Sequence, residues 1–317
     1  MRRLLSRVPT LDFVVIGAQK AGTTSLWRYL EDNPGLRMPP AKESPFFTEA
    51  GYPHELGRYM RALFKDAPRS AKLGTVTVSY MLGANGVDVP TVAARIRDAF
   101  PHVRLVALLR DPVDRALSAH RMSLREHGET RSFRDAVREQ LEPAELDRAR
   151  RDPTPTNTYV VAGEYGRILE AYLAHFDREQ LLVAFTADLE RAPGDVVRRV
   201  CEHLGVAPHV PEHLGERFYP GGRPRVSPEA EADLKRYLAR HVWPRMRHAA
   251  QHRTAFEFWL RLWNAEPGPP EEPPDDATAA ALREHYAPDV ERVAAIAGVE
   301  PPWATAYAPA TNAPRRG

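Results

Sequence analysis

The chain has 317 residues, which suits one large α/β domain or two small ones. Its 43% hydrophobic and 27% charged residues are ordinary for a globular protein, so the composition excludes wholesale disorder. The 44 Lys and Arg residues nearly balance the 42 Asp and Glu residues, and a net charge of +2 does not indicate a nucleic-acid partner. The single cysteine, Cys201, excludes an internal disulfide and a cysteine-built metal cluster and is typical of a reducing compartment.

The N-terminal residues do not have the pattern of a secretion signal or a membrane anchor. A basic start leads only into the short apolar run from Phe13 to Ile16. That run is far shorter than the core of a signal peptide or the roughly 20 apolar residues of a membrane span. We therefore expect a cytoplasmic protein without an integral membrane segment.

Strand and helix patterns alternate along much of the chain. Short β-branched or uniformly apolar runs predict strands, and apolar residues at helical spacing between capping signals predict helices. The expected strands are 13–16, 75–78, 103–109 and 181–185. The expected helices are 22–30, 89–100, one from Pro112, 165–176 and 195–204, followed by two closing helices within 282–296, a segment that contains Pro288. This alternation predicts an α/β fold with a central, mainly parallel sheet flanked by helices.

The later part of the chain differs in composition. We expect a single domain over residues 1–317, with a variable helical insertion and proline-rich linker at about 237–275 and a loose tail at about 305–317. Aromatic and basic residues interleave from His241 to Trp263. Such a stretch is typical of an amphipathic helix with aromatic residues in the core, and we expect it also to line part of an acceptor cleft. Stacking on nucleic acid or lying on a membrane surface would fit the same pattern.

The sharpest motif is GAQKAGTTS at residues 17–25, which runs from a strand into a helix. A helix N-terminus has free N–H groups and a positive dipole end, so it binds anions well. Glycines allow close backbone approach, hydroxyls donate hydrogen bonds, and Lys20 adds positive charge. Lys20 lies two residues before Gly22 and not directly after the last glycine, so this is not the usual loop for nucleoside triphosphates. The motif predicts a phosphate site of another kind.

A second anion site is predicted after the buried strand 103–109. Arg110 follows that strand directly, at the edge where open parallel sheets bind their ligands. Its planar guanidinium suits a phosphate better than a lysine does. Ser118 lies less than two turns into the next helix, so its hydroxyl could reach the same anion. An internal pair between Arg110 and Asp111 or Asp114 is the alternative.

These two sites together resemble the sulfotransferases that use 3′-phosphoadenosine 5′-phosphosulfate (PAPS), within them the bacterial and heparan-sulfate-type branch. The match consists of IGAQKAGTTS at 16–25, LRDP to Ser118 at 109–118, and the acidic loop KESPFF at 42–47. It is close over residues 12–120 and looser to about 235. The resemblance implies a P-loop-like three-layer fold and transfer of a sulfuryl group from PAPS to a hydroxyl or an amine.

The resemblance also implies which residues bind the donor. The 5′ side of PAPS would be held by residues of the first motif, namely Lys20, Ala21, Gly22, Thr23, Thr24 and Ser25. The 3′-phosphate would be held by Arg110 and Ser118. A later Gly-Arg loop would close over the cofactor, and its counterparts here are Tyr219, Gly222, Arg223 and Arg225. No metal is implied, and the 12 histidines show no metal-ligand spacing.

Two residues are candidates for the chemistry. Lys20 would stabilise negative charge that develops on the leaving 5′-phosphate. Glu43 matches the general base of the heparan-sulfate-type relatives, and nearby Phe46 and Phe47 could give this acid an apolar pocket. Those relatives often carry an acid and a lysine on the strand that here starts at Thr75 and Val76, so a charged partner for Glu43 is missing there. His54 and His120 are possible replacements for Glu43 as base, although a lone histidine is more often structural.

We therefore expect a PAPS-dependent sulfotransferase that acts on a small-molecule, glycan or lipid acceptor. A kinase-like nucleotide phosphotransferase is one alternative, but it would need a magnesium-binding acid and a lysine after the loop glycine. A non-catalytic nucleotide-binding module is the other, and it would not depend on Glu43. The sequence has no motif for the acceptor, does not distinguish O- from N-sulfation, and gives no oligomeric state.

Overall fold

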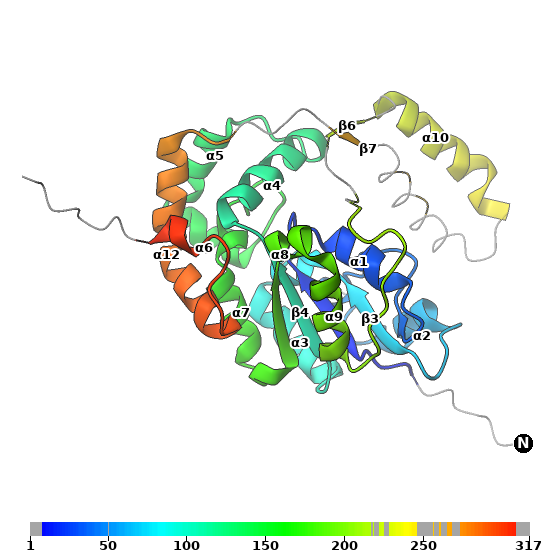
Figure 1. Cartoon of the computed structure of the whole chain (residues 1–317). Coiled ribbons are helices and arrows are strands. Elements are labelled where there is room, and N and C mark those ends of the chain that lie inside the picture. Colours follow the sequence, from blue (N-terminus) through cyan, green and yellow to red (C-terminus); the bar gives the residue numbers. More distant parts are fainter. Residues whose placement is uncertain are drawn as a thin grey trace, which may run out of the picture.

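The computed structural model describes residues 8–49, 51–216, 218, 222–224, 228–245, 256, 260, 265–267 and 273–308. Its centre is a five-stranded, all-parallel sheet in the order β2-β3-β1-β4-β5 (Figure 1). The strands are β1 (Phe13–Gly17), β2 (Leu36–Arg37), β3 (Lys72–Val76), β4 (Arg104–Leu109) and β5 (Leu181–Phe185). The predicted α/β fold with a parallel sheet is confirmed.

The two central strands are almost wholly apolar because both of their faces are covered. Every residue of β1 is buried, and all of β4 except Arg104 is buried as well. β1 pairs with β3 on one side and with β4 on the other, so that Val15 lies opposite both Val76 and Val106. Gly74 of β3 is needed for close packing, since a Cβ there would lie 2.3 Å from the Phe13 ring.

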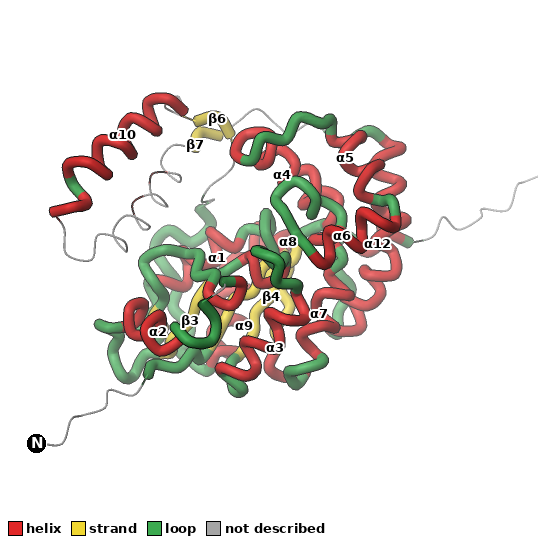
Figure 2. Tube along the Cα trace, turned by 180° about the vertical axis from the view of Figure 1, so that it is seen from behind, coloured by secondary structure: helices red, strands yellow, loops and turns green. Residues whose placement is uncertain are grey.

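Helices cover both faces of the sheet. On one face α1 (Thr23–Glu31) contacts α9 (Pro193–Leu204), which in turn packs on β4 and β5. On the other face lie α3 (Val89–Ala99) and α7 (Tyr165–Leu173), which contact each other and stand in front of the strands in Figure 2. α2 (Leu56–Phe64) lies beside the β3 end of the sheet in Figure 1. This is the three-layer arrangement that the sequence predicted.

The chain changes direction across the sheet between β1 and β4. The connection after β1 leads to β2 and β3 on one side, and the connection after β4 leads to β5 on the other. Adjacent parallel strands whose connections diverge in this way leave a crevice at their carboxyl ends, where α/β proteins bind ligands. Both predicted anion-binding motifs follow these two strands, so the topology brings them together.

A helical layer extends beyond the carboxyl ends of the strands. It contains α4 (Pro112–Glu126), α5 (Phe133–Gln140) and α6 (Pro143–Arg151). The sequence predicted α4 but not α5 or α6. α8 (Thr186–Arg191) follows β5 directly. Short 3₁₀ turns occupy Phe46–Thr48, Val78–Met81, Val161–Gly163, Arg178–Gln180, Trp243–Arg245 and Ala304–Tyr307.

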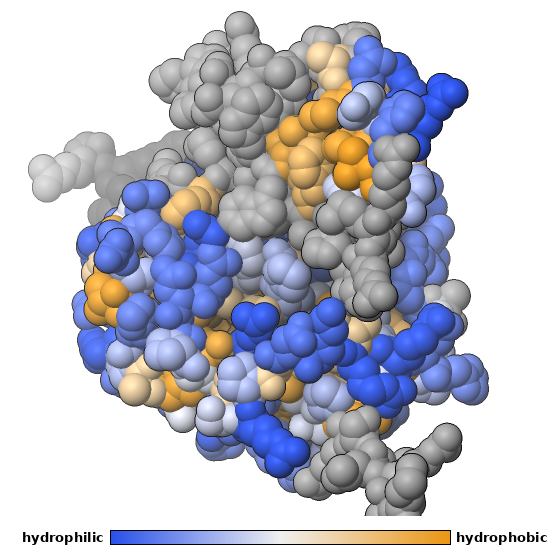
Figure 3. All heavy atoms as spheres, turned by 90° about the vertical axis from the view of Figure 1, so that its right-hand side faces the viewer, coloured by the Kyte–Doolittle hydropathy of each residue, from blue (hydrophilic) through white to orange (hydrophobic). Residues whose placement is uncertain are grey.

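A small two-stranded sheet and a helix form an arm on the same side of the molecule as α4 and α5 (Figure 1). β6 (Gly222–Pro224) and β7 (Ala265–Pro267) pair antiparallel, and α10 (Pro228–His241) follows β6. β7 lies at the start of the expected proline-rich linker, so a strand occurs there that the sequence did not predict. Figure 3 shows apolar side chains gathered at the level of α10, where Leu234 is 39% exposed. The expected single domain with an insertion at 237–275 stays a prediction.

The C-terminal part corrects two expectations. The segment 282–296 belongs to a single helix, α12 (Asp276–Ala297), which contains Pro288. The prediction of two closing helices is therefore wrong. The buried side chains of Tyr286, Asp289 and Val290 on both sides of the proline hold the helix against its neighbours. The expected loose tail is wrong for its first residues, because Tyr307 is buried at 5% exposure in an ordered turn. Within the described residues, no helix combines the length and hydropathy that crossing a membrane requires.

Candidate active site at the carboxyl edge of the sheet

The loop after β1 has the backbone geometry of an anion-binding site. Gly22 is the N-cap of α1 with φ of 86°, in the left-handed region that favours glycine, and Lys20 is held in the same region with φ of 66°. No side chain caps the N-terminus of α1, as is also true of α2, α6, α7, α8 and α9, whereas α3, α4, α5 and α12 each have an Asp or Ser cap. The first N–H groups of α1 are therefore left for a ligand anion.

Arg110 connects the two predicted anion sites. Its Nη1 donates to the backbone oxygen of Lys20 at 3.4 Å, and its Nη2 lies 3.8 Å from Asp114 Oδ2. The guanidinium side chain is 30% exposed, so it can still meet a ligand. Of the two alternative internal pairs, the one with Asp114 is therefore present. The one with Asp111 does not form, because Asp111 caps α4 by accepting from the N–H groups of Val113 and Asp114.

Thr186 connects the ends of three strands by hydrogen bonds. It was not among the residues that the sequence predicted for the site. Its hydroxyl, at the start of α8 after β5, lies 2.7 Å from the Ala21 oxygen and 3.0 Å from the Leu109 oxygen. Ala21 belongs to the loop after β1, and Leu109 ends β4. The hydroxyl can donate to either carbonyl, so it fixes the spacing of the two loops. Only the position of a threonine directly after a predicted strand could have suggested this.

The remaining residues of the two motifs are mostly buried. Thr23 and Ser25 of α1 and Ser118 of α4 are 4%, 9% and 7% exposed. The Ser25 hydroxyl accepts from the backbone N–H of Phe218 at 3.2 Å. Ser25 therefore has a structural partner inside the protein, and its predicted contact with a cofactor stays a prediction.

The segment before the predicted Gly-Arg loop is docked on α1. Tyr29 donates to the oxygen of Glu216 at 2.6 Å, and His213 Nε2 lies 3.1 Å from the oxygen of Arg28. This brings Phe218 to the first turn of α1, close to the phosphate loop. Gly222 and Arg223 follow in β6, while Tyr219 and Arg225 lie outside the described residues.

Glu43 is positioned at the carboxyl end of β3. One carboxylate oxygen forms an ion pair with the Lys42 ammonium, and the other accepts from the Val78 N–H at 3.0 Å. The Glu43 side chain is 41% exposed, whereas that of Lys42 is only 5% exposed. The charged partner that is missing on β3 is therefore supplied by the residue next to Glu43 in sequence.

The prediction of an apolar pocket around Glu43 is wrong. Phe46 and Phe47 are buried, and their rings pack on Tyr52, Tyr59 and Tyr80 and not around the carboxylate. The two replacement bases do not suit the role either. His54 is exposed on a turn, and the buried His120 has its Nε2 2.9 Å from the Arg131 oxygen with its ring against Phe133 and Tyr159.

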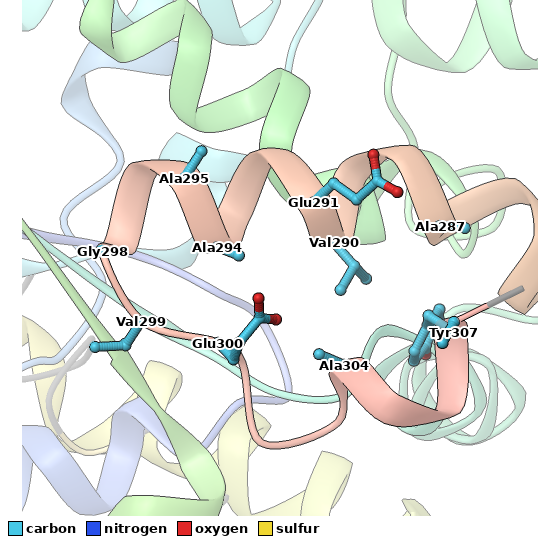
Figure 4. A pocket seen from close by; sticks show the side chains of 11 residues that line it. Ala287, Val290, Glu291, Ala294, Ala295, Gly298, Val299, Glu300, Ala304 and Tyr307 are labelled. Atoms are coloured by element: carbon cyan, nitrogen blue, oxygen red, sulfur yellow. The ribbon is translucent and has the colours of Figure 1, made fainter.

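A separate hollow lies between α12 and the segment 298–308 (Figure 4). It has a volume of about 710 Å³ and is lined mainly by alanine and valine, with Glu291 and Glu300. None of the residues predicted for chemistry or donor binding lines it. The candidate active site is instead the carboxyl edge of β3, β1, β4 and β5, where the loops of Glu43, Lys20, Arg110 and Thr186 meet.

Comparison with known proteins relates the chain to sulfotransferases. The sequence model described as "Sulfotransferase family" matches residues 90–210, which include Arg110 and Ser118. The chain is 26% identical to a solved sulfotransferase from Alicyclobacillus acidocaldarius, with a TM-score of 0.60 over 95% of this chain and 99% of that one. These similarities make the chain a homologue of bacterial and heparan sulfate sulfotransferases.

Two curated relatives of this chain are heparan sulfate enzymes. It is 29% identical over 218 residues to "Bifunctional heparan sulfate N-deacetylase/N-sulfotransferase 4" of Mus musculus, which covers 64% of this chain and 24% of that protein. It is 27% identical over 197 residues to "Heparan sulfate glucosamine 3-O-sulfotransferase 3B1" of Mus musculus, which covers 61% of this chain and 45% of that protein. The chain thus spans less than half the length of these curated relatives.

Proposed function

We propose that this chain transfers the sulfuryl group of PAPS to a hydroxyl or amine of a small-molecule, glycan or lipid acceptor. The observation that supports this most directly is the pairing of two anion sites at one crevice. The uncapped N-terminus of α1 suits the 5′-phosphosulfate, and Arg110, joined to Lys20 by a hydrogen bond, suits the 3′-phosphate. Similarity to sulfotransferases supports this donor over the nucleoside triphosphate of a kinase.

The reaction forms a new oxygen–sulfur or nitrogen–sulfur bond to the acceptor and breaks the bond between sulfur and the bridging oxygen of PAPS. The acceptor atom attacks sulfur, the bond from sulfur to the bridging oxygen breaks, and its electron pair stays on the 5′-phosphate. Lys20, at the positive end of α1, is suited to stabilise that charge. The acceptor proton goes to the Glu43 carboxylate, whose side chain is 41% exposed. No step uses a group from outside these residues and the two substrates.

The proposal is tested first by the donor. We expect the chain to bind 3′-phosphoadenosine 5′-phosphate (PAP) and to release it from PAPS when 4-nitrophenol, N-desulfated heparan sulfate or a long-chain alcohol is present. Arg110→Ala should weaken PAP binding by about 2 to 5 kcal/mol, as for the loss of one partner of a buried charge pair. Binding of adenosine 5′-phosphate should hardly change, because that nucleotide lacks the 3′ group.

Isothermal titration of both nucleotides against both proteins checks this prediction. Equal losses for the two nucleotides would mean that Arg110 does not bind the 3′-phosphate. A wild-type chain that binds neither nucleotide would overturn the proposed function itself. Normal PAP binding without any sulfuryl transfer across a broad acceptor panel would favour the non-catalytic module.

A further inference from the structure

Lys42 is a nearly buried cation beside the proposed base. Its side chain is 5% exposed and its ammonium forms an ion pair with Glu43 Oε1. Burying a lysine costs solvation free energy, which a single half-exposed carboxylate recovers only in part. An apolar side chain of similar length would fill the same space at lower cost. The presence of a lysine there is therefore not explained by stability.

The loop that carries the pair is fixed to β3. The N–H of Ser44 donates to Thr77 Oγ1 at 3.0 Å, and the buried Tyr80 hydroxyl donates to the Ser44 oxygen. Thr77 follows β3 directly, and its N–H donates to the Val15 oxygen of β1 at 2.9 Å. The position of Glu43 is therefore set by the same strands that position the phosphate loop.

The Glu43 carboxylate is held from two directions. Lys42 engages Oε1, and the Val78 N–H engages Oε2 at 3.0 Å, which fixes the plane of the carboxylate. Among the described residues, Lys42 is the cation with which Glu43 forms an ion pair. Both oxygens keep further lone pairs, and the exposed side of the carboxylate is free to face an acceptor.

We propose that Lys42 is the positioning residue of the proton acceptor, an inference that rests on the proposed function. Lys42 holds the Glu43 carboxylate in one orientation before transfer. When the acceptor loses its proton to Glu43, the carboxyl becomes neutral and its attraction to the ammonium falls. The proton then leaves to solvent through the exposed side, and the ion pair forms again. Lys42 thereby performs the task that no charged side chain of β3 performs here.

The experiment compares Lys42→Met, Lys42→Arg and a control, Lys72→Met. Lys72 pairs with Asp12 at 3.0 Å at the opposite end of β3, so the control removes an ion pair from the same strand but away from the site. The readouts are PAP release from PAPS, with 4-nitrophenol, with N-desulfated heparan sulfate and with water alone, across pH, together with PAP binding and thermal unfolding.

For Lys42→Met we expect a folded protein whose PAP affinity is within about twofold of wild type. Its kcat should be about 10- to 100-fold lower, because part of the contribution of a general base is lost. The KM for the acceptor should stay within about twofold of wild type, because Lys42 acts through the orientation of the carboxylate. Lys42→Arg should restore most of kcat, and Lys72→Met should match wild type. A purely structural lysine would lower the thermal stability without this selective loss of kcat.

A second measurement does not depend on the acceptor. In protein labelled with ¹⁵N-lysine, the Lys42 ammonium signal is identified by its absence in Lys42→Arg. It should shift or broaden in Glu43→Gln, since the ion pair is then lost, and stay unchanged in Lys72→Met.

Two outcomes would overturn the inference alone. They are an ammonium signal that is unchanged in Glu43→Gln, or a Lys42→Met enzyme with the wild-type kcat. Failure of the wild-type chain to bind PAP would overturn the proposed function as well, so the two failures are distinguishable.

Discussion

At the scale of single residues, the site depends on where one carboxylate is held. Glu43 is held by Lys42 and by the Val78 N–H, so its carboxylate is oriented without any apolar pocket around it. The role proposed for it is that of a base oriented to accept the acceptor's proton.

We expect Glu43→Gln to keep PAP binding near the wild-type value while the transfer rate falls by about 10² to 10⁴. Glutamine keeps the size and the hydrogen-bonding shape but cannot take the proton. The acidic limb of the pH–rate profile should disappear, because that limb reports protonation of the base. Steady-state kinetics from pH 4 to 9 check this. Normal turnover with an unchanged acidic limb would remove Glu43 from the mechanism.

At the scale of elements, the donor site is assembled from strand ends. The loop after β1, the end of β4 and the start of α8 are joined by Arg110 and Thr186 through backbone carbonyls of Lys20, Ala21 and Leu109. Carbonyl contacts of this kind fix the spacing of the loops and leave their N–H groups directed to a ligand. We infer that the spacing of the two phosphate sites depends on Thr186 as much as on the motifs.

Thr186→Val should weaken PAP binding about 3- to 10-fold, because it removes a hydrogen bond worth about 1 kcal/mol and leaves the carbonyls of two loops less well paired. The valine keeps the shape of the side chain. Thr158→Val is the matched control, since its hydroxyl donates to the Thr154 oxygen at 2.9 Å in another part of the protein. Titration calorimetry with PAP compares the two. An equal effect of both substitutions would show that Thr186 contributes only general stability.

At the scale of the whole molecule, the C-terminal turn closes back onto the donor site. The Tyr307 hydroxyl lies 3.1 Å from each carboxylate oxygen of Asp111, the residue that caps α4 directly after Arg110. Burial, with the nearby Asp111 carboxylate, raises the pKa of Tyr307 well above its ordinary value, so the hydroxyl stays a donor throughout the neutral and alkaline range. The turn of residues 304–307 therefore supports the start of α4.

Tyr307→Phe should lower the free energy of unfolding by about 1.5 to 3 kcal/mol, as for a lost hydrogen bond to a charged group. It should also weaken PAP binding more than binding of adenosine 5′-phosphate, since Arg110 precedes the affected cap. Urea denaturation and titration with both nucleotides measure these effects. Tyr52→Phe, which loses a hydrogen bond of 3.1 Å to the Arg95 oxygen, is the control and should leave the preference for PAP intact.

The sequence by itself determined four of the five sheet strands and the placement of the two predicted anion motifs after strands. The short strand β2 was not predicted, and the strand expected at 75–78 is β3 at 72–76. Short apolar runs such as 104–109 and capping patterns such as Asp111-Pro112 are local signals, so they predict β4 and the start of α4 without knowledge of the fold. The motif at 17–25 likewise predicted the loop after β1 because glycine, lysine and hydroxyls act there through neighbouring backbone.

Only the tertiary structure decided which residues support those motifs. Thr186 and Tyr307 meet the donor site from 77 and 196 residues away in sequence, and no local pattern encodes contacts of that separation. The single helix through Pro288 was also decided by packing, which outweighed the local signal of a helix break. Lys42 was visible in the sequence next to Glu43, but its burial, which gives the ion pair its role, follows from the way the loop folds onto β3.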